Sequence, residues 1–220
     1  MSLVVPVKSL ARAKTRLRGA ADGGLGDSGA HARLSLALAR DTVAAARAAR
    51  GVREVIVVTS DREVTTAMVA EGVAVLADRP ERGLNAALRF AAESLLGADP
   101  DRSVAALQAD LPALRADELA SALALARILF ESGSAPRAFC ADAQGEGTTL
   151  LVAAPGVPLA PRFGPGSARS HERAGAVRLR GEWPGLRRDV DTPDDLRRAA
   201  ELGLGPATSA ALRETARPRR

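Results

Sequence analysis

The sequence has very little cysteine, histidine and aromatic residue, and it has no tyrosine. Cys140 is the only cysteine among the 220 residues, which excludes an intrachain disulfide and a zinc site built from cysteines. His31 and His171 are the only histidines; we expect His31 at the exposed start of a helix and His171 in a loop, and no Ser-His-Asp arrangement is evident. Four Phe and one Trp offer no aromatic surface on which nucleic-acid bases could stack.

Long apolar runs and a secretion signal are also missing. No stretch of about 18 or more apolar residues occurs, so we expect no membrane-spanning helix. The N-terminus lacks a basic segment followed by a small-residue cleavage site, so we expect a cytoplasmic protein. The net charge is +5, but a large part of it lies in residues 206–220, which we expect to be a basic, disordered tail. We therefore expect a single domain over residues 1–205, with neither nucleic acid nor membrane as its partner.

Lysine is also scarce, because almost all the basic residues are arginine. Lys8 and Lys14 are the only lysines among the 31 basic residues, and both lie in the first loop. A compact ammonium is not interchangeable with a planar guanidinium. We therefore predict that these two positions need lysine, with chance as the alternative.

Apolar segments alternate with amphipathic ones along the chain. The short apolar runs predict strands at 3–7, 54–59, 74–77, 103–108, 137–141, 149–153 and 177–179. The helical patterns cover 30–49, 62–71, 84–96, 116–132 and 193–202. This order predicts an α/β, Rossmann-like fold, with a mostly parallel sheet flanked by helices. Ligands bind at the carboxyl ends of the strands in such sheets, so the loops there are the candidate site.

A cationic segment follows the first predicted strand. It contains Lys8, Arg12, Lys14 and Arg16 within nine residues, which suits a polyphosphate. The segment is not a P-loop, because no GxxxxGK[ST] pattern occurs. An exposed basic turn is the alternative.

Carboxylates stand at two other places where ligands are expected. Asp110 comes just after the strand predicted at 103–108, and Asp189 and Asp191 alternate about Val190, so they point the same way in extended chain. Two carboxylates on one side repel each other unless a cation lies between them. We predict that the three hold one or two Mg²⁺ ions. The alternatives are a turn or helix-start role for Asp110 and a helix-start role for Asp191.

Two further segments indicate recognition of a ligand. Gly-Leu-Asn-Ala-Ala-Leu (83–88) opens a helix, and the Asn85 side chain offers both a donor and an acceptor. Arg-Phe-Gly-Pro-Gly-Ser (162–167) leads into a short helix predicted over 167–174. Gly164 lets a backbone amide approach an anion closely, and Ser167 adds a hydroxyl group.

Six motifs occur in a fixed order: VPVKSLARAKTRL, GLNAAL, QADLPAL, GTTLL, RFGPGSARSHERAGAV and DVDTPDDL. In this order the chain resembles the CofC/FbiD family, the guanylyltransferases of coenzyme F-420 biosynthesis, over residues 3–204. The resemblance implies a nucleotidyltransferase fold related to the molybdenum-cofactor guanylyltransferases. It also implies transfer of GMP from GTP to phosphoenolpyruvate, which yields enolpyruvoyl-2-diphospho-5'-guanosine and pyrophosphate.

The resemblance also assigns roles to residues of this chain. By the family pattern, the groups that bind phosphoenolpyruvate are Thr148, Gly164 and Ser167. Combined with the residues read above, it gives Mg²⁺ to Asp110, Asp189 and Asp191, and contacts with the nucleotide to Lys8, Arg12, Lys14 and Asn85. Lys8 and Lys14 would also be catalytic, by balancing the charge on the departing pyrophosphate.

Several alternatives stay open at this point. The acceptor could be 2-phospho-L-lactate or 3-phosphoglycerate, small phosphorylated three-carbon acids like phosphoenolpyruvate. A nucleotidyltransferase acting on molybdopterin or a sugar phosphate, and a nucleotide-binding protein without turnover, are more remote. The expected partners are GTP, the acid and a downstream deazaflavin transferase, and the chain would be a monomer or a homodimer.

Overall fold

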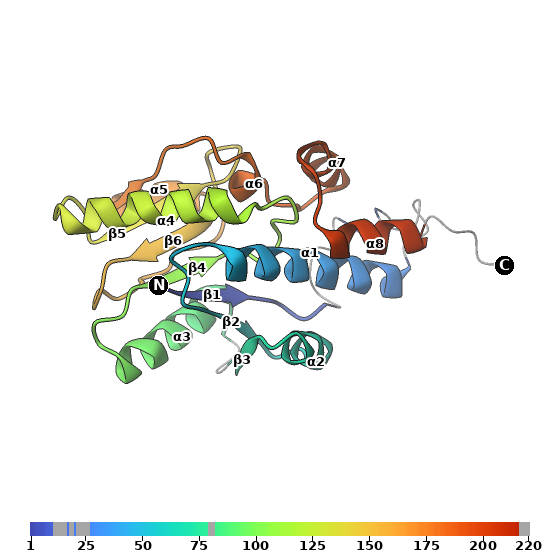
Figure 1. Ribbon diagram of the computed structural model, residues 1–220, viewed down its shortest axis with the longest axis horizontal. Coiled ribbons are helices and arrows are strands. Elements are labelled where there is room, and N and C mark those ends of the chain that lie inside the picture. The colour runs from blue at the N-terminus through green and yellow to red at the C-terminus, as the bar shows by residue number, and fades with distance from the viewer. Residues whose placement is uncertain (11–16, 18–19, 21–26, 79–81, 216–220) are drawn as a thin grey trace.

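The computed structural model describes residues 1–220 except 11–16, 18–19, 21–26, 79–81 and 216–220 (Figure 1). Its strands are β1 (Ser2–Pro6), β2 (Glu54–Thr59), β3 (Ala74–Ala77), β4 (Val104–Leu107), β5 (Arg137–Ala141), β6 (Thr148–Ala153) and β7 (Ala176–Arg178). Its helices are α1 (Ser28–Ala48), α2 (Arg62–Ala70), α3 (Leu84–Ala98), α4 (Ala116–Glu131), α5 (Ser167–Arg173), α6 (Pro184–Arg187), α7 (Pro193–Leu202) and α8 (Pro206–Thr215). Within the described residues, no helix is long and apolar enough to cross a membrane.

The strands form one sheet in the order β3-β2-β1-β4-β6-β5-β7. β6 pairs antiparallel with both β4 and β5, and every other neighbouring pair in the described sheet is parallel. The predicted mostly parallel α/β sheet is therefore confirmed. Because β6 runs against the rest, its amino end lies at the same edge as the carboxyl ends of β1, β4 and β5.

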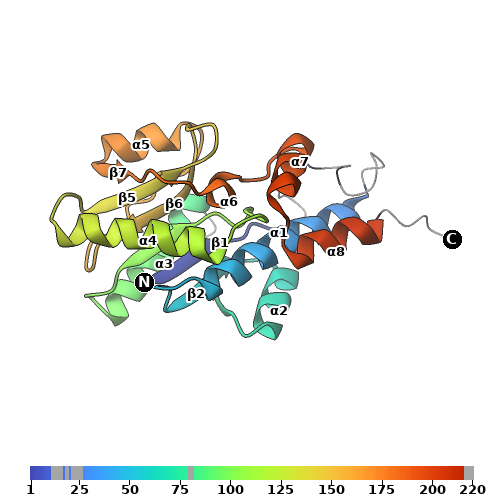
Figure 2. The same cartoon turned by 45° about the horizontal axis from the view of Figure 1, so that its top comes forward.

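The sheet is covered by helices on both faces. Side chains of successive strand residues alternate between the faces. Leu3 and Val5 of β1 lie in a core with α1, α2 and α4, whereas Val4 lies in a second core with α3 and α5. Figure 2 shows α4 and α5 on opposite sides of β5 and β6. Burial on both faces explains why the strands read as continuous apolar runs.

The C-terminal helix α8 contradicts the prediction of a disordered tail over its length. It lies alongside α1 (Figure 1), and the buried Asp41 carboxylate of α1 accepts hydrogen bonds from Ala207 N (2.9 Å) and Thr208 N (2.7 Å) at its start. The turn before it is tight, because a Cβ on Gly205 would lie 2.3 Å from Asp41 Cγ. A capped N-terminus and packing against α1 give this segment the order that its charge did not predict. Residues 216–220 of the predicted tail lie outside the described residues.

Candidate active site

A cavity of about 700 Å³ opens at the edge where β1, β4 and β5 end and β6 begins. This volume lies within the range of ligand sites. The predicted site residues that line it are Lys8, Asp110, Thr148, Gly164, Ser167, Asp189 and Asp191. Asn85 is not among its lining residues, and the predicted Arg12 and Lys14 lie outside the described residues.

The acidic wall of the cavity, formed by Asp110, Asp189 and Asp191, joins two segments that are distant in the sequence. The Val190 N–H donates to the Asp110 carbonyl oxygen at 3.0 Å, which holds residues 189–191 beside the end of β4. Val190 is fully buried, and Asp189 and Asp191 on either side of it both line the cavity. The alternation in the sequence therefore places the two carboxylates on the same side.

The helix starts nearby do not account for these carboxylates. Helix α7 begins with a capping box, in which Thr192 Oγ1 accepts from Asp195 N at 3.2 Å and the Asp195 carboxylate accepts from Thr192 N at 2.9 Å. Helix α4 begins after Arg115. Asp191 and Asp110 are thus not the N-cap residues of these helices, which excludes an N-cap role for both. The turn role named as an alternative for Asp110 is not tested by these caps.

The donor set of this wall suits a hard cation. Asp110, Asp189 and Asp191 offer only oxygen atoms, which are the ligands that Mg²⁺ prefers. Among the residues that the structure describes, no group of three or more His, Cys, Asp or Glu side chains could hold a metal by itself. The three carboxylates therefore line one cavity without forming a complete metal cage. This arrangement fits Mg²⁺ held by one or two carboxylates together with substrate phosphates.

Lys8 is held at the cavity by contacts on both sides of it. The Val7 N–H donates to the Val58 carbonyl oxygen at 2.9 Å, which prolongs the pairing of β1 with β2. The Leu10 N–H donates to the Asp61 carboxylate at 2.9 Å, and Asp61 is the N-cap of α2. The exposed Lys8 side chain therefore projects from a fixed backbone.

Asp61 makes the stability of this region depend on pH. Partial burial would raise the pKa of the carboxyl group, but hydrogen bonds from the Leu10 N–H and from the first turn of α2 outweigh it and hold the pKa below its ordinary value. The stabilisation is therefore present at neutral pH and is lost as the pH falls below about 4, through the folded-state pKa. We expect Asp61→Ala to lower the free energy of unfolding by about 1 kcal/mol at pH 7. The difference from wild type should shrink at pH 3, as measured by urea unfolding, and an equal difference at both pH values would contradict this origin.

Asn85 fixes the loop that carries Gly164 and Ser167. Its Nδ2 donates to the Phe163 carbonyl oxygen at 2.9 Å, and the Phe163 N–H donates to its Oδ1 at 2.7 Å. Both ends of the amide therefore bind the backbone of one residue. The structure brings Asn85 to this loop rather than to the cavity wall, where a contact with the nucleoside was predicted.

The loop itself needs glycine for its backbone conformation. Gly164 has φ 135° and Gly166 has φ 66°, values that side-chain-bearing residues rarely adopt. No atom lies within 4 Å of a Cβ placed on either residue. The requirement at Gly164 is thus conformational, and the space in front of it belongs to the cavity.

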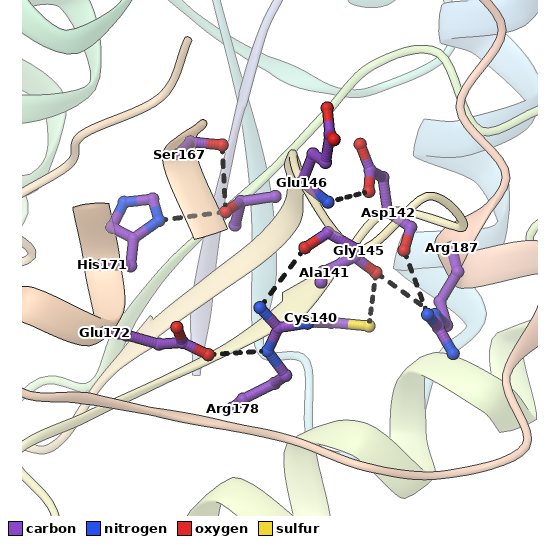
Figure 3. Close-up of polar contacts among 11 residues, drawn as sticks. Cys140, Ala141, Asp142, Gly145, Glu146, Ser167, His171, Glu172, Arg178 and Arg187 are labelled. Carbon is purple, nitrogen blue, oxygen red and sulfur yellow. Dashed lines mark hydrogen bonds and ion pairs between the residues drawn. The ribbon is translucent and has the colours of Figure 1, made fainter. Parts of the chain in front are cut away.

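The hydroxyl groups of Thr148 and Ser167 form a buried pair at the cavity. Ser167 Oγ donates to Thr148 Oγ1 at 3.1 Å, and His171 Nδ1 lies 3.0 Å from Thr148 Oγ1; Figure 3 labels Ser167 and His171 and draws these two contacts as dashed lines. The expectation of a loop for His171 was wrong: it lies within the helix predicted over 167–174, which is α5, and is 1% exposed. Burial, followed by the nearby charges of Arg162 and Arg137, lowers the pKa of His171 to about 4.

The other histidine, His31, was predicted on the surface at the start of a helix. It lies at the start of α1 but is buried there.

The turn between β5 and β6 is a rigid part of the site that the sequence did not reveal. The Asp142 carboxylate accepts from Glu146 N at 2.9 Å and from Gly147 N at 2.7 Å, and these three residues line the cavity. Arg187 donates to the Asp142 carbonyl oxygen at 3.1 Å, and Arg178 to the Gly145 carbonyl oxygen at 3.3 Å (Figure 3). The turn thus holds Thr148, which follows it directly.

Solved structures share the fold. A chain from Desulfovibrio desulfuricans, described as a nucleotide-diphospho-sugar transferase, superposes with a TM-score of 0.62 at 16% identity, covering 97% of both chains. A nucleotidyl transferase from Methanothermobacter superposes with a TM-score of 0.58 at 20% identity, covering 91% of this chain and 96% of the other. Both share the architecture of this chain.

The sequence comparisons define the class. Residues 35–179 match the MobA-like NTP transferase domain, so the chain belongs to that family and is a nucleotidyltransferase. Within it, the chain belongs with the proteins named phosphoenolpyruvate guanylyltransferase, as the resemblance predicted. It is 52% identical to the one from Geodermatophilus obscurus, covering 99% of this chain and 96% of the relative. It is 51% identical to the one from Streptomyces coelicolor, covering 95% and 94%.

Proposed function

We propose that this protein transfers GMP from GTP to phosphoenolpyruvate, in coenzyme F-420 biosynthesis. The observation that carries the proposal is one cavity that combines the hydroxyl pair of Thr148 and Ser167 with three carboxylates and Lys8. Relatives about 50% identical over nearly the full length are named for this reaction. The site residues and the acceptor are proposals for this chain. A cytoplasmic location and delivery of the product to a deazaflavin transferase are further parts of the proposal.

The acid substrate is assigned to the half of the cavity formed by the β6 start and the 162–167 loop. Thr148 and Ser167 supply hydroxyl donors, and the open space at Gly164 leaves room for a carboxylate or phosphate. Anionic oxygens make the stronger hydrogen bonds with such donors. This is the half in which the alternatives 2-phospho-L-lactate and 3-phosphoglycerate would compete.

The nucleotide is assigned to the other half. Lys8 would bind its phosphates and balance the charge that develops on the pyrophosphate, with Arg12 and Lys14 predicted to join it. Nucleotidyltransferases generally use a divalent metal ion. We propose that Asp110, Asp189 and Asp191 hold Mg²⁺ with the substrate phosphates, where it would neutralise phosphate charge.

The reaction needs little from side chains beyond positioning. A phosphate oxygen of the acid attacks the α-phosphorus of GTP, the new P–O bond forms, and the bond to the β-phosphate oxygen breaks to release pyrophosphate. A phosphate monoester has a second pKa of about 6, so the attacking oxygen is already ionised at neutral pH. No general base is required, and catalysis is alignment and charge stabilisation.

Product analysis tests the proposal directly. GTP with Mg²⁺ is incubated with phosphoenolpyruvate, 2-phospho-L-lactate or 3-phosphoglycerate in parallel, and with ATP or CTP as control nucleotides. We expect pyrophosphate release that depends on phosphoenolpyruvate, and a product with the mass of GMP joined to that acid. The downstream deazaflavin transferase can trap a labile product. Pyrophosphate release with a different acid would reassign the acceptor, and no release with any of the three would favour a binding protein.

A further inference from the structure

His171 is a buried histidine that the reaction described above does not use. Its ring lies between two aromatic side chains, with centroids 5.7 Å from Phe139 and 5.3 Å from Phe163. Each ring nitrogen has a polar partner: Nδ1 lies 3.0 Å from Thr148 Oγ1, and the Arg162 N–H donates to Nε2 at 3.0 Å. The ring thus connects the backbone of the 162–167 loop to a hydroxyl group of the cavity.

The backbone partner decides where the ring proton lies. The Arg162 N–H can only donate, so Nε2 must be an unprotonated acceptor. A neutral imidazole then carries its proton on Nδ1, and this N–H donates to Thr148 Oγ1. Protonation of Nε2 would set two donors against each other, which agrees with the lowered pKa of His171, about 4.

The tautomer also decides how the hydroxyl groups are oriented. His171 Nδ1–H takes one acceptor position of Thr148 Oγ1, and the hydroxyl proton of Ser167 takes the other. The second hydroxyl proton is therefore left to point into the cavity that both residues line. With the proton on Nε2 instead, Thr148 would donate to the ring, and Ser167 alone would have to serve both Thr148 and a ligand.

We propose that His171 is a positioning residue that fixes the Thr148 and Ser167 hydroxyl pair as a hydrogen-bond donor toward an anionic oxygen of the acid substrate. The identity of the acid rests on the proposed function. The orientation of the hydroxyl groups rests on the contacts of His171 and on the hydrogen bond between Ser167 and Thr148. A site prepared in this way selects an ionised carboxylate or phosphate oxygen, because either one can only accept.

The first test reads the tautomer without any substrate. The chain has only two histidines, so long-range ¹H–¹⁵N correlation spectra of ¹⁵N-labelled protein can be assigned with a single His31→Gln variant. We expect His171 to carry its proton on Nδ1 and to stay neutral from pH 8 to pH 5. A proton on Nε2, or titration near the ordinary histidine value, would overturn the proposal whether or not the protein uses phosphoenolpyruvate.

The second test asks whether His171 acts through Thr148. His171→Leu removes both ring nitrogens, whereas His171→Asn keeps an amide donor near the Nδ1 position. We expect His171→Leu to raise the KM for phosphoenolpyruvate about 10-fold, with the KM for GTP changed less than about twofold. His171→Asn should recover part of the loss. In a Thr148→Val background, His171→Leu should add less than about twofold, because the hydroxyl group that it orients is gone.

The controls separate this role from a structural one. Equal increases in the KM for both substrates, or the full 10-fold effect in the Thr148→Val background, would contradict positioning through Thr148. Urea unfolding of each variant shows whether it is folded at the assay temperature. If the variants do not fold, the tautomer of the wild-type protein still decides. Absence of turnover in the wild type would refute the proposed function and not the hydroxyl orientation.

Discussion

Replacing Asp110 by Asn is expected to lower kcat for guanylyl transfer by about 1000-fold, equivalent to about 4 kcal/mol of transition-state stabilisation. Asp110 lines the cavity beside residues 189–191, to which its backbone is bonded through Val190. Asn keeps the size of the side chain and removes the negative charge. The backbone bond does not involve the side chain, so the fold should be retained. Pyrophosphate release at saturating GTP and phosphoenolpyruvate measures the effect.

The matched control is an exposed carboxylate outside the cavity. Asp101 lies in the turn before β4 and is exposed, so Asp101→Asn should leave kcat within about twofold. A titration with Mg²⁺ adds a second readout, because loss of a ligand should raise the metal concentration that Asp110→Asn needs for its residual activity. Near-wild-type kcat in Asp110→Asn would refute the metal assignment.

Replacing Lys8 by Met is expected to lower kcat/KM for GTP by about 100-fold, the usual effect of removing one electrostatic donor from a transition state. Met keeps the length of the side chain without the ammonium group. Lys8→Arg should recover only part of the activity, because a planar guanidinium does not reproduce a compact point charge. Initial rates at varied GTP and fixed phosphoenolpyruvate give the value.

The control for Lys8 is an exposed cation outside the cavity. Arg127 is exposed on α4 and forms an ion pair with Glu131 at 3.5 Å, so Arg127→Met should have almost no effect on the rate. Full activity in Lys8→Arg would mean that any cation suffices at this position. Full activity in Lys8→Met would remove Lys8 from the site.

Most of the fold could be predicted because the strands are buried on both faces. Segments such as Glu54–Thr59 contain continuous apolar runs with clear ends. The helix predicted over 167–174 matches α5, which begins at the same residue and ends one residue earlier. The helix α8 was missed because its order depends on Asp41, which lies far away in the sequence. The short α6 was missed because its N-terminal amides are bonded by the Glu118 side chain of another helix.

The candidate site was predictable where a residue directly follows a strand. Asp110 and Lys8 come shortly after β4 and β1, and the topology brings them to one edge. Thr148 begins β6 and was assigned from the family resemblance. Asn85 and His171 were not predictable in this way. Their polar atoms bind the backbone of Phe163 and Arg162, and such pairings between distant segments have no local pattern in the sequence.

Asp41 has a consequence for how the molecule is made. Asp41 is 6% exposed, and its carboxylate accepts hydrogen bonds from amides that lie 166 and 167 residues further along the chain. A ribosome produces α1 before α8, so the Asp41 carboxylate has neither amide partner until 166 further residues have been synthesised. Burial of a charge without them is costly. The packing of α8 against α1 therefore forms only after α8 has been synthesised, and nascent chains that end before Pro206 lack this support of α1.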